Sequence, residues 1–165
     1  IAVDGVPLVL DPGGEIYSAR TFGPGRYESK LLNSYGHSVP RINGKLQTNR
    51  VGGDAFNPPE NLTPVKDIQG ILLKNGFSLE HGMAKFDISR VYNHIPGIKK
   101  LERTFYFDRK NGGSFLVSDE AEFNEASEFE NAVITLGNVK ELAAQKAVVL
   151  KAIADVEKEQ NVKLV

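Results

Sequence analysis

The chain has 165 residues, of which 41% are hydrophobic and 25% charged, and its formal net charge is −1. This is the composition of a globular domain, and the balanced charge argues against the basic surface that nucleic-acid binding requires. The sequence has no cysteine and no apolar run of ~20 residues, which excludes disulfides, cysteine-ligated metals and membrane-spanning helices. We therefore expect no nucleic-acid partner and no membrane partner.

Both ends of the chain fall in apolar, strand-like sequence. Ile1 opens one such stretch and residues 162–165 form another, and neither end has the pattern of a signal peptide. We expect residues 1–165 to form a single domain that is a fragment of a larger chain.

Turn sequences divide most of the chain into short strands. Four dipeptides accept positive φ at low cost, namely Asp4-Gly5, Asn43-Gly44, Asn75-Gly76 and Asn111-Gly112. Each lies between apolar or β-branched segments, and such repeated hairpin signals predict an antiparallel β-sandwich. Alternation predicts strands over 86–92 and 101–107, whereas 49–64 is predicted to be a long loop. Arg103 shares a face with apolar residues, which favours a structural role, at a sheet edge or in an ion pair, over a ligand contact.

The last third of the sequence carries two unresolved patterns. Six acidic residues lie between Asp119 and Glu130, where a solvated strand face is favoured over calcium ligation because no EF-hand spacing is present. Residues 139–158 are rich in helix formers and predict an amphipathic helix. The β-branched run at 147–150 and the segment 161–165 instead predict strands.

The stretch from residue 8 to residue 47 gathers the most unusual side chains. Asp11 ends an apolar strand and precedes Pro-Gly-Gly, where it could project toward a ligand or form an Asx turn with its own loop. His37 follows Gly36, which allows a close backbone approach. A carboxylate and an imidazole could begin a zinc site, but two ligands are too few for a complete one. A metal site and a purely structural role both remain open.

Aromatic and basic residues surround this histidine in the sequence. The tyrosines are Tyr17, Tyr27 and Tyr35, and the arginines are Arg20, Arg26 and Arg41. Arginine binds carboxylates bidentately and tyrosine can pack on flat faces or donate a proton, so the set suits an anionic sugar. No Walker A, dinucleotide-binding, nucleophile-elbow or HExxH motif is present.

The stretch resembles the C-terminal β-sandwich domain of heparinase II/III-like polysaccharide lyases. The resemblance lies in Leu10-Asp-Pro-Gly-Gly14 with Tyr17, in Arg26-Tyr27, and in Ser34-Tyr-Gly-His-Ser-Val-Pro40 with Asn43-Gly44. Arg103 and Phe115-Leu-Val-Ser-Asp119 fit the later strands of that domain. The family joins an N-terminal helical toroid to the sandwich and cleaves uronate-containing polysaccharides by β-elimination.

The resemblance implies a role for five residues. Asp11 and His37 correspond to metal ligands, so the cofactor would be zinc. Tyr27 corresponds to a tyrosine lining the sugar cleft, with an auxiliary catalytic role, and Arg26 and Tyr35 would join it in binding substrate. The first metal histidine of the family would fall before Ile1, and its main catalytic tyrosine belongs to the toroid, so this chain alone is expected to be inactive.

The resemblance also implies partners, location and the form of the C-terminal segment. The partners would be an anionic polysaccharide, such as a glycosaminoglycan or alginate, and the helical toroid domain of the same protein. The location would be periplasmic or secreted. The family continues as sheet near the C-terminus, which favours strands near 147–152 and 161–165 over a helix. The alternative function is a non-catalytic carbohydrate-binding or structural β-sandwich module.

Overall fold

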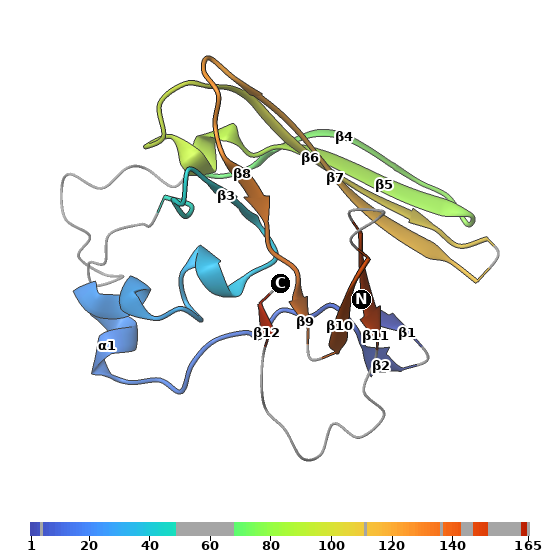
Figure 1. Ribbon diagram of the computed structural model, residues 1–165, viewed down its shortest axis with the longest axis horizontal. Helices are drawn as coiled ribbons and strands as arrows, with labels where there is room; N and C mark the ends of the chain where they lie inside the picture. Colours follow the sequence, from blue (N-terminus) through green and yellow to red (C-terminus); the bar gives the residue numbers. More distant parts are fainter. Residues whose placement is uncertain are drawn as a thin grey trace. The chain divides into compact units, whose positions relative to one another are not determined.

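The computed structural model describes residues 1–3, 5–48, 68–110, 112–135, 137–142, 147–151 and 163–164. Within these ranges the chain is mostly β, in antiparallel sheets with a few short helical turns (Figure 1), as expected from the sequence. The chain divides into two compact units. The first comprises Ile1–Arg41, Val51–Pro58 and Phe129–Val165, and the second Ile42–Arg50 and Pro59–Glu128. No helix of the described ranges is long and apolar enough to cross a membrane.

The second unit is built on a four-stranded antiparallel sheet of order β4-β5-β6-β7 (Figure 1). Its strands are β4 (Ile71–Phe77), β5 (His81–Asp87), β6 (Ile98–Asp108) and β7 (Ser114–Phe123). A short 3-10 helix, η4 (Ser89–Tyr92), connects β5 to β6. Each strand pairs with its neighbour in sequence, so the sheet is a meander built from local hairpins.

The two faces of this sheet differ in polarity because side chains alternate along each strand. On one face, Lys85 and Lys100 each form ion pairs with both Glu102 and Glu120, at 2.6 to 3.2 Å. The opposite face carries packed aromatic rings, with centroids 6.2 to 6.3 Å apart between neighbours. These rings belong to Phe86, Phe105, Phe107 and Phe115.

A buried ion pair interrupts the aromatic face. The Arg103 Nε donates to Asp119 Oδ1 at 2.7 Å, and its Nη2 donates to Asp119 Oδ2 at 2.9 Å. Only 7% of the arginine side chain and 3% of the aspartate side chain are exposed. The structural role predicted for Arg103 is therefore confirmed, and it takes the form of an ion pair. Asp119, one of the six acidic residues between 119 and 130, is buried as its partner and does not lie on a solvated face.

The first unit contains short strand pairs and helical turns. Its strands are β1 (Ala2–Val3), β2 (Val6–Pro7), β3 (Pro40–Ile42), β8 (Phe129–Asn131), β9 (Ile134–Thr135), β10 (Asn138–Leu142), β11 (Ala147–Lys151) and β12 (Lys163–Leu164). They pair as β1-β2, β3-β8, β9-β12 and β10-β11. Between β2 and β3 lie α1 (Ala19–Phe22) and the 3-10 helices η1 (Pro24–Glu28) and η2 (Ser34–Gly36).

Three turn dipeptides behave as predicted at their described residues and a fourth does not. Gly5 has a φ of 80° between β1 and β2, where Val3 pairs with Val6. Asn43 and Gly44 have φ of 51° and 69° and form a tight turn after β3, and Gly112 lies at positive φ between β6 and β7. Asn75 and Gly76 instead lie inside β4, so the turn predicted there is wrong. The chain turns after Phe77, where the Ser78 hydroxyl accepts hydrogen bonds from the N–H groups of Glu80 and His81. Asp4 and Asn111 lie outside the described residues.

Two segment predictions also need correction. The strand expected over 86–92 ends at Asp87, whose Oδ1 accepts from Ser89 N–H at 2.8 Å and starts η4. The helix over 139–158, the alternative to strands, is wrong where the chain is described, because β10 and β11 pair antiparallel with Glu141 opposite Val148. The strands favoured near 147–152 and 161–165 are present as β11 and β12. Residues 143–146 and 152–158 lie outside the described part, as does the loop predicted over 49–64.

Removing one member of the buried pair should destabilise the domain strongly. We expect Asp119→Ala to lower the free energy of unfolding by ~3–5 kcal/mol, because Arg103 is left charged and buried without its partner. The matched control is Glu122→Ala, which removes a surface ion pair with Lys99 and should cost less than ~1 kcal/mol. Urea denaturation followed by circular dichroism measures both, and equal losses would contradict the structural role of Arg103.

Tyr92 should make the fold sensitive to alkali. Its side chain is fully buried, and this burial raises the pKa of its hydroxyl from 10.0 to about 12. The folded pKa lies above the unfolded one, so stability is fully present below pH 10.0 and falls as the pH rises toward about 12. The two-unit difference corresponds to about 3 kcal/mol. Urea unfolding at several pH values should show this fall, and Tyr92→Phe should remove it; an equal fall in the variant would rule out Tyr92 as its source.

Candidate functional site

Asp11 stands at the end of a segment that is bound to β9. The Leu10 N–H donates to the Ile134 carbonyl at 3.1 Å, and Thr135 Oγ1 donates to the Leu8 carbonyl at 2.6 Å. Beyond this anchor, Asp11 Oδ1 accepts from the Gly13 N–H at 2.8 Å. The Asx turn considered from the sequence is therefore present, and it leaves the second carboxylate oxygen of Asp11 available for another contact.

His37 is placed by the residues on either side of it. It follows η2, whose N-terminus is capped by Asn33 Oδ1, which accepts from Tyr35 N–H at 2.8 Å. A Cβ atom at Gly36 would collide with the Lys30 carbonyl oxygen, which explains the glycine before the histidine. After it, Ser38 Oγ accepts from the Ile134 N–H at 3.1 Å.

The two predicted metal ligands meet in the folded chain. His37 Nδ1 and Asp11 Oδ2 are 2.8 Å apart, although the residues lie 26 positions apart in the sequence. The pair is open to solvent, since 30% of the histidine side chain and 64% of the aspartate side chain are exposed. The hydrogen bond from the Gly13 N–H, and to a smaller extent that from the His37 ring, hold the pKa of the Asp11 carboxyl below its usual value of 3.8.

This contact fixes how the imidazole can act. An ionised carboxylate only accepts hydrogen bonds, so His37 Nδ1 carries the proton. In the neutral ring, Nε2 then presents a lone pair that can take a proton. A metal ion bound by both side chains would instead replace the Nδ1 proton between His37 and Asp11. Within the described residues, no cluster of three or more His, Cys, Asp or Glu side chains surrounds a possible ion. The donor types of Asp11 and His37 fit zinc, but a zinc site takes three or four protein ligands.

The residues predicted to bind sugar lie on the 3-10 helices that precede His37. Tyr27 and Arg26 lie on η1, where the guanidinium carbon of Arg26 is 5.8 Å from the centre of the Tyr27 ring. Arg26 Nη1 also donates to the Thr21 carbonyl at 2.8 Å. Tyr35 lies on η2, and the Lys30 ammonium is 5.0 Å from its ring centre. Each predicted tyrosine therefore has a cationic side chain near its ring.

Asn33 links these two helices. Its Nδ2 donates to the Tyr27 carbonyl at 3.1 Å while its Oδ1 caps η2 at Tyr35. The side chain is nearly buried, with the residue 9% exposed. One asparagine thus connects the peptide group of Tyr27 to that of Tyr35, two residues before His37.

The other predicted aromatic and basic residues are engaged elsewhere. Arg20 pairs with Glu15 at 2.6 Å, and Arg41 binds Glu130 through two hydrogen bonds at 2.6 and 2.8 Å. Tyr17 is 76% exposed and contacts the Phe22 ring edge to face, with centroids 5.3 Å apart. Of the three arginines, only Arg26 forms no ion pair within the described residues.

Three positioning residues were not predicted from the sequence. Asn33 had a detectable signal, because asparagine immediately before a helical turn is a common N-cap. Ser38 and Ile134 had none, since their hydrogen bond joins residues 96 positions apart.

Comparison of the sequence with protein-family models and with curated proteins finds no match. The interpretation of this site therefore depends on its own residues and their geometry.

The pKa of Asp11 should report both of its hydrogen bonds. We expect the carboxyl to titrate below 3.8 in the native chain. In His37→Ala the pKa should rise but stay below 3.8, because the Gly13 N–H is the larger cause of the lowering. Carboxyl carbon NMR over pH 2 to 6 measures both values, with His94→Ala as the control for loss of an exposed histidine. An unchanged pKa in His37→Ala would contradict the contact.

Proposed function

We propose that this chain is the β-sandwich part of a heparinase II/III-like polysaccharide lyase that acts outside the cytoplasm. In this proposal Asp11 and His37 contribute to a zinc site, and Tyr27, Arg26 and Tyr35 contact a uronate-containing polysaccharide. The catalytic base and acid of β-elimination belong to a helical toroid domain of the same protein. This chain supplies substrate contacts and helps to shape the cleft.

The observation that carries the proposal is the contact between Asp11 and His37. Two residues selected as metal ligands from separate parts of the sequence lie 2.8 Å apart and remain accessible to solvent. A structural Asx turn alone would account for Asp11 but not for its second oxygen reaching an imidazole. The pair supports a partial metal site that a further ligand could complete.

The chemistry assigned to each side chain follows from its type. Zinc bound here would supply a fixed positive charge at the edge of the cleft. Arg26 has guanidinium N–H groups that can pair with a uronate carboxylate, and neutralising this carboxylate favours removal of the neighbouring proton. Tyr27 would present its ring to the sugar and its hydroxyl to a transferred proton.

A non-catalytic carbohydrate-binding module is the second candidate. The exposed Tyr17 and Phe22 rings favour it, because an accessible aromatic pair can pack against sugar rings without a metal. This function predicts uronate binding that is insensitive to a chelator, whereas the lyase proposal predicts binding that weakens when zinc is removed.

Zinc affinity tests the proposal directly. We expect the chain to bind zinc in competition with a chromophoric chelator, and His37→Ala to weaken that binding by at least about tenfold. His94→Ala is the matched control, because it removes an exposed histidine that contacts Thr48 instead. A loss of zinc affinity in His37→Ala but not in His94→Ala supports the site. Undetectable binding, or equal affinity in the two variants, contradicts it.

A further inference from the structure

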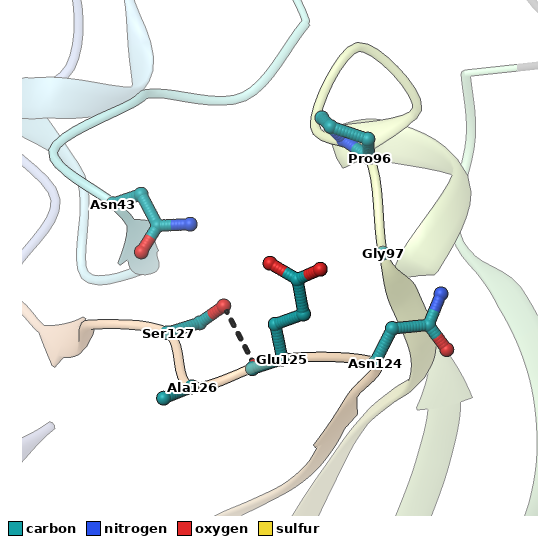
Figure 2. A pocket seen from close by; sticks show the side chains of 7 residues that line it. All are labelled: Asn43, Pro96, Gly97, Asn124, Glu125, Ala126 and Ser127. Carbon is teal, nitrogen blue, oxygen red and sulfur yellow. Dashed lines mark hydrogen bonds between the residues drawn. The ribbon is translucent and has the colours of Figure 1, made fainter.

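The second unit contains a polar hollow that is lined by none of the residues proposed to bind zinc or uronate. Its volume is about 350 Å³, which is within the range of small-ligand sites. It is bordered by the turn at Asn43, by Pro96 and Gly97, and by the loop 124–127 (Figure 2). All of these residues belong to the second unit, whereas Asp11 and His37 belong to the first.

Backbone hydrogen bonds hold the walls of this hollow in place. The Asn124 N–H donates to the Gly97 carbonyl at 2.8 Å, which joins the loop to the start of β6. Asn43 binds Glu128 twice, through its own N–H to the Glu128 carbonyl at 3.0 Å and through its Oδ1 to the Glu128 N–H at 2.8 Å. Ligand binding would therefore require little ordering of these segments.

These bonds also determine which groups of the walls remain for a ligand. Because Asn43 Oδ1 accepts from Glu128, its NH₂ group is the part left to donate. Figure 2 shows the Asn43 amide and the Glu125 carboxylate directed toward the same space, with Pro96 across from them. The hollow therefore offers the Asn43 NH₂ group as a donor, the Glu125 carboxylate as an acceptor and the Pro96 ring as an apolar surface. The polar side chains of Asn124 and Ser127 also line it.

The Glu125 carboxylate differs from four of the five other acids of its segment. Asp119, Glu120, Glu122 and Glu130 each form an ion pair with a lysine or arginine. In the part of the chain that the structure describes, Glu125 has no cationic partner, and its backbone carbonyl alone accepts from Ser127 Oγ at 3.3 Å. The Glu125 carboxylate is therefore available to accept hydrogen bonds from a ligand in the hollow.

We propose that this hollow binds an uncharged, hydroxyl-rich sugar unit. The Glu125 carboxylate would accept hydrogen bonds from two neighbouring sugar hydroxyls, the Asn43 NH₂ would donate to a sugar oxygen, and the Pro96 ring would contact the C–H face. A uronate is disfavoured because its carboxylate would be repelled by Glu125. The proposal does not depend on lyase activity, since it uses neither Asp11 nor His37.

Amide NMR shifts of the 165-residue chain test this site with neutral methyl glycosides of glucose, galactose and mannose as probes. We expect at least one glycoside to produce saturable shifts at Gly97 and at residues 124–128. Glu125→Gln should weaken that binding about tenfold or more, because it removes a charged acceptor. The matched control, Glu122→Gln, changes a nearby glutamate that does not border the hollow and should leave the affinity unchanged.

Three results would overturn the proposal. The first is no saturable shift with any neutral glycoside up to its solubility limit. The second is equal affinity in Glu125→Gln and Glu122→Gln. The third is a response of the same amides to calcium chloride or methyl glucuronide but to no neutral glycoside. Because His37→Ala should leave glycoside binding intact, failure here is distinguishable from failure of the zinc site.

Discussion

The backbone of Ile134 joins the two segments on which the candidate metal site depends. Its carbonyl accepts from the Leu10 N–H and its N–H donates to Ser38 Oγ, each at 3.1 Å, and the residue is fully buried. Leu10 precedes Asp11 and Ser38 follows His37, so one buried residue connects the two segments that carry these side chains. The 2.8 Å contact between Asp11 and His37 is a consequence of this bridge, because neither residue has another long-range anchor of its own in the described chain.

The distribution of ion pairs separates structural charges from those that remain for ligands. On the four-stranded sheet, lysines and glutamates neutralise one another on one face, and the Arg103 and Asp119 pair is buried on the other. These groups fix the register and leave little charge for recognition. The accessible groups outside these pairs include the Asp11 and His37 contact in the first unit and Glu125 in the second. One can hold a cation and the other a neutral polyol, so the two proposals assign different ligands to different units.

The sequence predicted correctly those features that depend on residues close together in the chain, and it missed features that depend on residues far apart. The turn at Asn43-Gly44 and the Asx turn of Asp11 were predictable, because each depends on a few adjacent residues. Arg103 could be recognised as structural because an alternating strand placed it among apolar residues. The turn predicted at Asn75-Gly76 is absent because pairing of β4 with β5 outweighs the turn propensity of these two residues. The helix formers near Glu141 form a strand because β10 pairs with β11. The bridge through Ile134 could not be predicted, since no local pattern identifies a partner 96 residues away.

The zinc proposal requires Asp11 and His37 to be ligands of one metal ion. A crystal structure of the zinc-soaked chain, with anomalous diffraction recorded on both sides of the zinc edge, tests this requirement. We expect an anomalous peak about 2.0–2.2 Å from a nitrogen of His37 and from an oxygen of Asp11. A peak only at His81 or His94, or an intact Asp11 and His37 hydrogen bond with no zinc beside it, would rule the site out.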